Sequence, residues 1–133
     1  MAQSLNKNRE PLSELNYVKK AENVINNLKK NKKGQLCLTT NKIRNLLTLI
    51  NELYNKARFI KTDSIDSSMQ GYIQYIKMRF VYEGGRDPNV KELIEKSNML
   101  TYLDSIDNSK EKLLRVCHYM EALVAYHRYN TSD

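Results

Sequence analysis

The fold is decided around residues 72–87, which read YIQYIKMRFVYEGGRD. Apolar residues recur there at the spacing of one helix face: Ile73, Ile76 and Phe80. The opposite side alternates aromatic rings with a cation: Tyr75, Arg79 and Tyr82. The pattern predicts a helix with one buried side, whose other side suits a polyanion with bases or sugars within reach. The same outward residues are also compatible with solvated charges at the rim of the core.

We expect this helix to stop at Gly84-Gly85, which suits a left-handed C-terminus and then presents Arg86. Phosphate-binding loops also use glycine, but no strand pattern precedes this pair and no Gly-Lys-Ser/Thr follows it. Asp87-Pro88 then predicts a new helix, with the aspartate as its N-cap and the proline in its first position.

Apolar residues keep the helical spacing on both sides of this stretch, and no alternating strand pattern occurs. We expect helices from the cap Ser13 to about Lys30, from Thr39 or Thr40 to about residue 57, from Asp87 to about residue 106 in two pieces, and from Ser109, or from Asn108 in a capping box with Glu111, to about Tyr129. The prediction is all-α, a single compact bundle of five to six helices over residues 13–133. Residues 1–12 are polar and predict a mobile lead-in.

Positive charge is concentrated in the first half of the chain. The formal net charge is +7, yet residues 1–62 carry 13 Lys and Arg against 4 Asp and Glu, whereas residues 63–133 carry 9 against 11. The helix predicted after Thr39 has cations and amides on its outer side, with Glu52 as its one acid there. These are the residue types that contact phosphate, so we expect a basic face and an acidic partner, nucleic acid first.

A second basic run follows the first predicted helix at Lys29–Gly34, which reads KKNKKG. Cations at a helix C-terminus complement the helix dipole, and this explanation is sufficient by itself. Contact with phosphate is the alternative.

Residues that could carry catalysis are few and do not converge. The two histidines, His118 and His127, lie nine positions apart on the last helix, and His127 falls on its apolar stripe. Glu83 and Asp87 flank the glycine pair, where capping and charge balance explain both carboxylates. We therefore predict no catalytic residue, no metal site and no cofactor.

The two cysteines, Cys37 and Cys117, lack metal-ligand spacing, and Cys117 sits among apolar neighbours as a buried thiol does in a reducing compartment. A bridge between them is possible but unsupported. The N-terminus shows no apolar signal region, and no run approaches the roughly 20 apolar residues that span a bilayer. We expect a cytoplasmic protein without membrane contact.

Three segments together resemble the small subunit of type III-A CRISPR effector complexes: Thr39–Leu47 (TTNKIRNLL), Ile76–Asp87 (IKMRFVYEGGRD) and Tyr119–Tyr129 (YMEALVAYHRY). The resemblance runs from about residue 14 to the end. The family often has Ala-Gly-Arg where this chain has Gly84-Gly85-Arg86, a mild departure.

This resemblance implies a helical subunit without nuclease activity. Several copies would stack as the minor filament of the complex, beside the subunits that hold the guide RNA. They would help to line the channel for the duplex of guide RNA and target RNA, in antiviral defence. Target cleavage and cyclic-nucleotide synthesis would belong to neighbouring subunits.

Within the matching segments, the resemblance places contact with the RNA backbone on Lys42, Arg44, Arg79 and Arg86. Composition and helix face add a second group: Lys56, Arg58, Lys77 and Tyr82. Each cation would neutralise phosphate, which supplies affinity without sequence choice. Contact between subunits is expected at Arg115, Tyr126 and Tyr129, which lie on an aromatic side of the last helix.

Two alternatives stay open at this point. The chain could be a pure protein-interaction module whose positive charge serves acidic neighbouring subunits. Less expected is a small RNase that uses His118 or His127.

Overall fold

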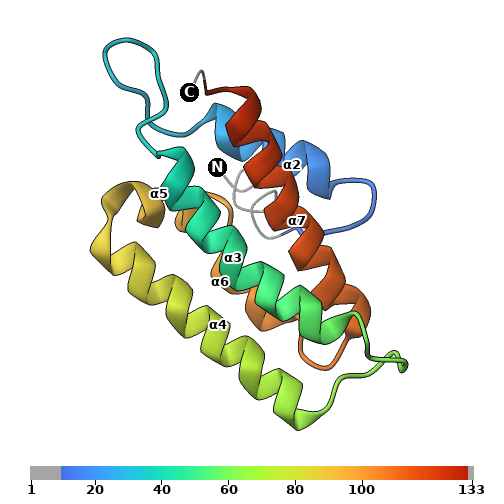
Figure 1. Cartoon of the computed structure of the whole chain (residues 1–133). Coiled ribbons are helices and arrows are strands. Elements are labelled where there is room, and N and C mark those ends of the chain that lie inside the picture. Colours follow the sequence, from blue (N-terminus) through green and yellow to red (C-terminus); the bar gives the residue numbers. More distant parts are fainter. Residues whose placement is uncertain (1–9, 132–133) are drawn as a thin grey trace.

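The structure, a computed structural model, describes residues 10–131 and contains six helices there (Figure 1). These helices are α2 Tyr17–Asn26, α3 Thr40–Ala57, α4 Ser67–Arg86, α5 Pro88–Lys96, α6 Met99–Ser105 and α7 Lys110–Tyr129. In the described part of the chain, β pairing is limited to isolated bridges between Lys30 and Leu36 and between Ser64 and Ser109. The predicted all-α bundle of five to six helices is confirmed.

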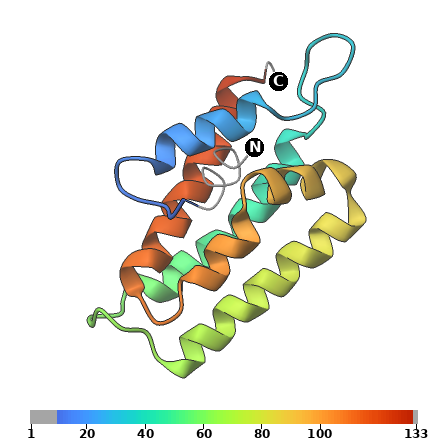
Figure 2. The same ribbon diagram turned by 180° about the vertical axis from the view of Figure 1, so that it is seen from behind.

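The helices form two layers. Three of them lie side by side, with α3 between α7 and α4, and α2, α5 and α6 pack behind them (Figures 1 and 2). The residues between the layers are almost fully buried, among them Ile43, Leu53, Ile76, Phe80, Met120 and Leu123. Burying each such side chain contributes about 1.5–3 kcal/mol relative to leaving it in water. The two helices with the predicted cationic faces are therefore neighbours in one layer.

Side-chain caps set the first residue of four helices. In each case the side-chain oxygen of the cap accepts a hydrogen bond from the backbone N–H three residues later. The pairs are Thr39 Oγ1 with Lys42 (3.4 Å), Asp66 Oδ1 with Met69 (2.9 Å), Asp87 Oδ1 with Val90 (3.2 Å) and Ser109 Oγ with Lys112 (3.1 Å). Of the two caps considered for the last helix, Ser109 is confirmed and the Asn108 capping box is wrong. The carbonyl of Asn108 instead accepts from the Ile65 N–H at 2.9 Å, which ties it to the loop before α4.

The expected helix stop at Gly84-Gly85 is wrong, because α4 runs through both glycines. The stop comes from Asp87, whose extended backbone (φ −145°, ψ 118°) precedes Pro88. A residue before proline is disfavoured in the helical region. Gly84 has another role: a Cβ there would lie 3.3 Å from Ile94 Cδ1, so the glycine lets α5 approach α4 closely.

The first predicted helix is too long at its start. α2 begins at Tyr17, and its predicted cap Ser13 belongs to the preceding turn. There the Ser13 N–H donates to Asn16 Oδ1 at 2.7 Å, and the Asn16 N–H donates to Ser13 Oγ at 3.2 Å. This reciprocal pair has the pattern of a capping box, and the Tyr17 N–H donates to the Ser13 carbonyl at 3.1 Å, so the turn leads directly into α2.

The same helix ends at Asn26 rather than near Lys30. Beyond its end, backbone groups form hydrogen bonds with side chains of α5. Lys96 Nζ donates to the Asn27 carbonyl at 2.6 Å, and the Glu92 carboxylate accepts from the Lys29 N–H at 3.0 Å. The basic run that follows is therefore a loop with its own structure.

Most of the predicted lead-in, residues 1–9, lies outside the described residues. The last residues of that segment are held by the bundle. The Glu10 carbonyl accepts from the Tyr102 hydroxyl at 2.8 Å, and Leu12 packs against the core.

Candidate nucleic-acid interface

The two helices predicted to contact RNA run antiparallel and are joined by polar contacts at both ends. Near the start of α3, Lys42 Nζ lies 3.4 Å from the carboxylate of Asp87, just after α4. Farther along α3, Glu52 accepts from the hydroxyl of Tyr72, near the start of α4, at 3.2 Å. We call this contact zone the α3–α4 seam; its polar residues are Lys42, Glu52, Lys56, Tyr72, Tyr75, Arg79, Glu83, Arg86 and Asp87.

The arginines of α4 are paired within the chain. Arg79 donates to the Tyr75 hydroxyl at 3.2 Å, and this bond raises the pKa of the guanidinium above its ordinary value. Arg86 lies 3.4 Å from a carboxylate oxygen of Glu83, and its guanidinium lies 5.5 Å from the ring centre of Tyr82. A phosphate that binds either arginine must share it with these partners.

Lys42 is paired as well, and its partner has two functions. Asp87 caps α5 by accepting from the N–H groups of Asn89 (2.8 Å) and Val90 (3.2 Å). Burial pushes the pKa of this carboxyl upward, but the two N–H groups and the Lys42 ammonium outweigh burial and hold the pKa below its ordinary value. Asp87 is therefore ionised at neutral pH and offsets the charge of Lys42.

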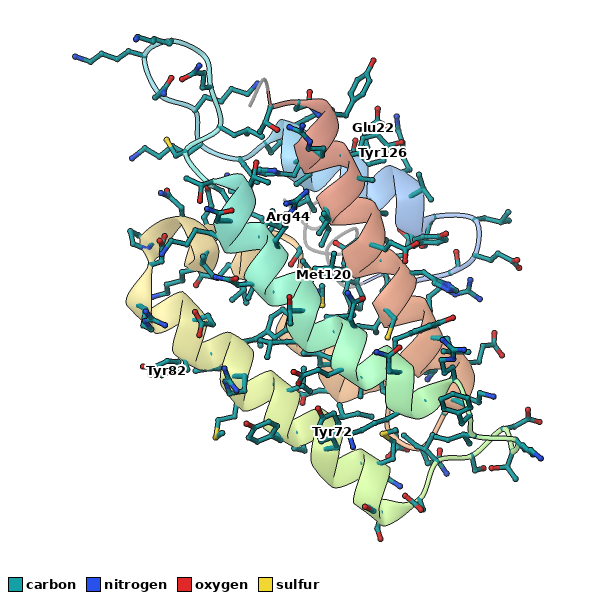
Figure 3. All side chains as sticks on the ribbon, viewed as in Figure 1. Glu22, Arg44, Tyr72, Tyr82, Met120 and Tyr126 are labelled. Atoms are coloured by element: carbon teal, nitrogen blue, oxygen red, sulfur yellow. The ribbon has the colours of Figure 1, made fainter. Side chains whose placement is uncertain are left out.

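Arg44 differs from these cations. It is exposed, and its guanidinium has no hydrogen bond or ion pair to residues 10–131. It lines a groove of about 290 Å³ between α3 and α7, with Glu121 and Arg128 on the opposite helix. Figure 3 labels Arg44 in this position, on the side of α3 toward α7, whereas Tyr72 lies between α3 and α4.

RNA contact is predicted at both Arg44 and Arg79, so their separation in the fold matters. Measured from the end where Lys42 meets Asp87, Arg44 lies two residues along α3 and Arg79 lies eight residues back along α4. At about 1.5 Å per residue, the two arginines are offset by about 9 Å along antiparallel neighbouring axes. They are on adjacent helices of one layer and not at opposite ends of the molecule.

The second group of predicted RNA contacts, Lys56, Arg58, Lys77 and Tyr82, does not lie on one surface. Lys56 Nζ lies 4.9 Å from the ring centre of Tyr72, beside the seam, and Arg58 stacks on the exposed ring of Phe59 at 4.9 Å. Tyr82 is exposed along the outer edge of α4 (Figure 3). Lys77 does not join them, because it donates to Asp104 of α6 at 2.8 Å, on another side of α4.

The residues predicted for subunit contact do not form one patch. Arg115 pairs weakly with Glu111 at 3.8 Å, and Tyr126 is partly buried against the core. Tyr129 at the end of α7 is 87% exposed. About 21 Å of helix separates Arg115 from Tyr129. A contact between subunits through these residues stays a prediction.

The groups that could have carried catalysis are packed into the bundle. His127 is 0% exposed, and its Nε2 lies 2.7 Å from the Leu38 carbonyl, which can only accept, so Nε2 carries the proton. His118 is half-buried between the rings of Tyr17 (6.3 Å) and Tyr54 (6.5 Å). The RNase alternative therefore has no pair of histidines that face one another.

The cysteines of the chain are free thiols. Burial raises the pKa of Cys117 to about 12, so this thiol stays protonated and unreactive at neutral pH. Within residues 10–131, no three His, Cys, Asp or Glu side chains come together as a metal site would need. None of the helices described is long and apolar enough to cross a bilayer.

Sequence reasoning left one basic element out of the predicted site. Residues 29–37 form a hairpin that projects from the bundle (Figures 1 and 2). It carries Lys30, Lys32 and Lys33, all exposed. The signal was the turn sequence Asn31 to Gly34, which predicts an ordered reversal as well as a helix end.

Comparisons with known proteins agree with the resemblance of the three segments. Residues 12–133 match the family described as Csm2 Type III-A. A CRISPR system Cms protein Csm2 from Streptococcus thermophilus is 43% identical over 118 residues, which cover 89% of this chain and 93% of that protein. Proteins of the same name are similar: 41% identity over 113 residues in Mycobacterium tuberculosis (85% of this chain, 90% of the relative) and 39% over 94 residues in Enterococcus italicus (69% and 67%).

Proposed function

This chain belongs to the Csm2 type III-A family, and we propose on that basis that it is a non-catalytic small subunit of a CRISPR effector complex. In this role it contacts the backbones of guide RNA and target RNA through the α3–α4 layer and takes part in cytoplasmic antiviral defence. Base pairing between guide and target supplies the sequence specificity, so the subunit needs only phosphate contacts.

The observation that carries the proposal is that the Arg44 side chain is exposed and unpaired among residues 10–131. An exposed guanidinium at a groove between two helices, without an internal partner among residues 10–131, is available for a phosphate at no cost in broken contacts. The paired cations Lys42, Arg79 and Arg86 continue from there across the α3–α4 seam and add positive field along a strand. The non-catalytic role is supported by the burial of His127 and Cys117 in the bundle and by the half-buried position of His118 beside the rings of Tyr17 and Tyr54.

A second function is favoured by a separate observation on α4. Its outer face exposes four large apolar side chains: Tyr75, Met78, Val81 and Tyr82. Gly71 and Gly85 lie at the two ends of this face, and a Cβ at either would meet nothing within 4 Å. A glycine costs a helix about 1 kcal/mol relative to alanine, and nothing in this fold requires either one. The face suits close contact with another protein chain, either a further copy stacked in the minor filament or another subunit.

The experiment combines Arg44→Ala with Arg79→Ala in the co-purified complex. Capture of target RNA should weaken, and the slope of log affinity against log salt concentration should decrease in magnitude by about 1.4–1.8, for two lost phosphate contacts. The charge-preserving double variant, Arg44→Lys with Arg79→Lys, should retain most of the salt dependence.

A matched control removes two exposed lysines at the far end of the bundle, Lys61→Ala with Lys112→Ala. It changes the net charge equally and should leave RNA capture near that of the wild type. Equal RNA capture by the double-arginine variant and the wild type at several salt concentrations would contradict the RNA role. Loss of co-assembly, with unchanged RNA affinity per assembled complex, would favour the pure protein-interaction module.

A further inference from the structure

The 29–37 hairpin is an ordered element although it projects from the bundle (Figure 1). The side-chain oxygen of Asn31 accepts from the backbone N–H groups of Lys33 (2.9 Å) and Gln35 (3.0 Å). The backbone N–H of Asn31 donates to the backbone carbonyl of Gln35 at 2.8 Å. Gly34 takes the positive φ of 79° that the turn requires. These bonds order the backbone from which Lys32 and Lys33 project.

The base of the hairpin is tied to the bundle. The Cys37 N–H donates to the Lys29 carbonyl at 3.0 Å, and the Lys29 N–H donates to both carboxylate oxygens of Glu92 on α5, at 3.0 and 3.2 Å. The cationic tip is therefore held at a set distance from α5 and from the end of α7.

The lysines at the tip have no counter-charge in the part of the chain that is described. Lys30, Lys32 and Lys33 are exposed, and none of the three ammonium groups meets a carboxylate or a ring there. Three like charges on a fixed turn repel one another, and an anion placed between them removes this cost.

Beside the hairpin lies an open cleft of about 690 Å³. One wall is the turn at Gly34–Leu36, the floor is Thr39-Thr40 at the start of α3, and the other wall is the end of α7 with Tyr129. Its volume is within the roughly 300–1,000 Å³ of sites that hold a small molecule or a nucleotide-sized group. Thr40 also lines the Arg44 groove, so the two depressions adjoin.

We propose that this cleft binds an unpaired nucleotide of single-stranded RNA, with its base on the ring of Tyr129 and its flanking phosphates on Lys32 and Lys33. The inference rests on the proposed function and adds a second RNA site to it. Stacking on an aromatic ring is tolerant of sequence because every base has a π-face, and lysine neutralises phosphate without reading a base.

The exposed ring favours RNA over an acidic protein segment as the occupant. An acidic segment would satisfy the lysines but would leave the 87% exposed Tyr129 ring without a planar partner. A nucleotide satisfies both features, because its charge and its aromatic surface are one phosphate–sugar unit apart.

The test uses the full chain alone and in the co-purified complex. The probes are a fluorescent 12-nucleotide oligouridine, a matched RNA duplex and an oligouridine carrying 5-iodouridine for photocrosslinking. We expect crosslinks at Tyr129, and oligouridine binding about 10-fold weaker for Tyr129→Ala but nearly unchanged for Tyr129→Phe, since phenylalanine keeps the stacking surface. Lys32→Ala with Lys33→Ala should reduce the salt slope by about 1.4, and the control Lys61→Ala with Lys112→Ala should reduce it much less.

Several results would overturn the inference. These are no crosslink at Tyr129 in the complex, wild-type oligouridine binding by Tyr129→Ala, or an equal loss in the hairpin and control lysine variants. Failed co-assembly of the hairpin variant with unchanged RNA affinity would assign the lysines to an acidic subunit instead.

The duplex probe separates this inference from the proposed function. If the cleft is wrong and the proposed function holds, duplex capture depends on Arg44 and Arg79 while the hairpin variants behave as the wild type. The reverse pattern would support the cleft and contradict the predicted contact through α3 and α4.

Discussion

The two basic regions of this molecule use their cations differently. Along the α3–α4 seam, every cation named above meets a partner within the chain: Lys42 with Asp87, Lys56 with Tyr72, Arg79 with Tyr75, and Arg86 with Glu83 and Tyr82. In the 29–37 hairpin, Lys30, Lys32 and Lys33 meet no such partner among residues 10–131, and Arg44 resembles them. Both regions hold four cations, but the seam also holds three carboxylates, Glu52, Glu83 and Asp87, whereas residues 29–37 hold none.

This difference shows that the charge of a side chain and its availability to a phosphate are separate properties. A paired cation has already exchanged part of its hydration for an internal contact, so a phosphate gains only the difference between the two partners. An unpaired cation on an ordered backbone gives up nothing within the chain. Per residue, the hairpin and Arg44 should therefore contribute more RNA affinity than the seam, whose pairs fix the relative positions of α3, α4 and α5.

The largest expected effect comes from breaking the contact that holds the hairpin region to α7. His127→Ala removes a fully buried ring and leaves the Leu38 carbonyl without its 2.7 Å donor. A cavity and an unsatisfied carbonyl together should lower the free energy of unfolding by about 2–4 kcal/mol, measured by urea denaturation.

Hydrogen exchange in the same variant tests whether the two regions are independent. Amides of residues 29–40 should lose protection, while those of α4 and α5 should keep theirs. His127→Phe is the control, since it fills the space but cannot donate to the carbonyl, and it should recover only part of the loss. Uniform loss of protection across the chain would show that the hairpin and the seam do not open independently.

The next effect sharpens the comparison by making one seam cation resemble those of the hairpin. Asp87→Ser keeps an N-cap for α5 but removes the carboxylate that forms an ion pair with Lys42. RNA affinity should rise a few-fold, with little change in stability. Asp87→Ala frees Lys42 equally but loses the cap, which should cost about 1 kcal/mol of unfolding free energy.

The control for this pair is Glu14→Gln, which raises the net charge by the same amount at an exposed position in the turn before α2. If Glu14→Gln strengthens RNA binding as much as Asp87→Ser, the gain is a matter of net charge and pairing has no part in it. Thermal denaturation and fluorescence anisotropy with duplex RNA measure both quantities on the same samples.

Much of this architecture could be predicted from the sequence because it depends on local patterns. The apolar spacing of residues 73–80 and the caps Thr39 and Ser109 are properties of neighbouring residues, and the structure confirms them. The helix end predicted at Gly84-Gly85 was wrong because Gly84 lets Ile94 pack closely against α4. This is a tertiary contact, which local sequence rules do not describe.

The candidate site was less predictable for the same reason. Whether a lysine is available depends on which carboxylate the fold brings near it, and Asp104 reaches Lys77 from 27 positions away. The order of the hairpin depends on Glu92, 63 residues from Lys29. The number of cations can be counted from the sequence, but the carboxylates that pair with them are known only from the fold.

The smallest expected effect concerns acid and the base of the hairpin. Burial pushes the pKa of Glu92 upward, but the Lys29 N–H and the Lys96 ammonium outweigh it and hold the pKa below its ordinary value of 4.5. A carboxyl with a lowered pKa in the folded state stabilises that state above its ordinary pKa, and the contribution is lost as the pH falls through the folded value. Glu92→Gln should therefore be less stable than the wild type at pH 7, by less than about 1 kcal/mol for so exposed a contact, and the gap should close between pH 5 and pH 3.

Urea denaturation at several pH values measures that gap, and Glu95→Gln on the same helix is the matched control because its carboxylate is exposed and forms no contact with the hairpin. Hydrogen exchange at Lys29 and Cys37 should quicken in Glu92→Gln at pH 7, since these amides depend on the base of the hairpin. Parallel stability curves for wild type and Glu92→Gln across this pH range would mean that the carboxylate does not hold the hairpin. The lysines at its tip would then be as loosely placed as those of any solvated loop, and the contrast between the two basic regions would lose its structural basis.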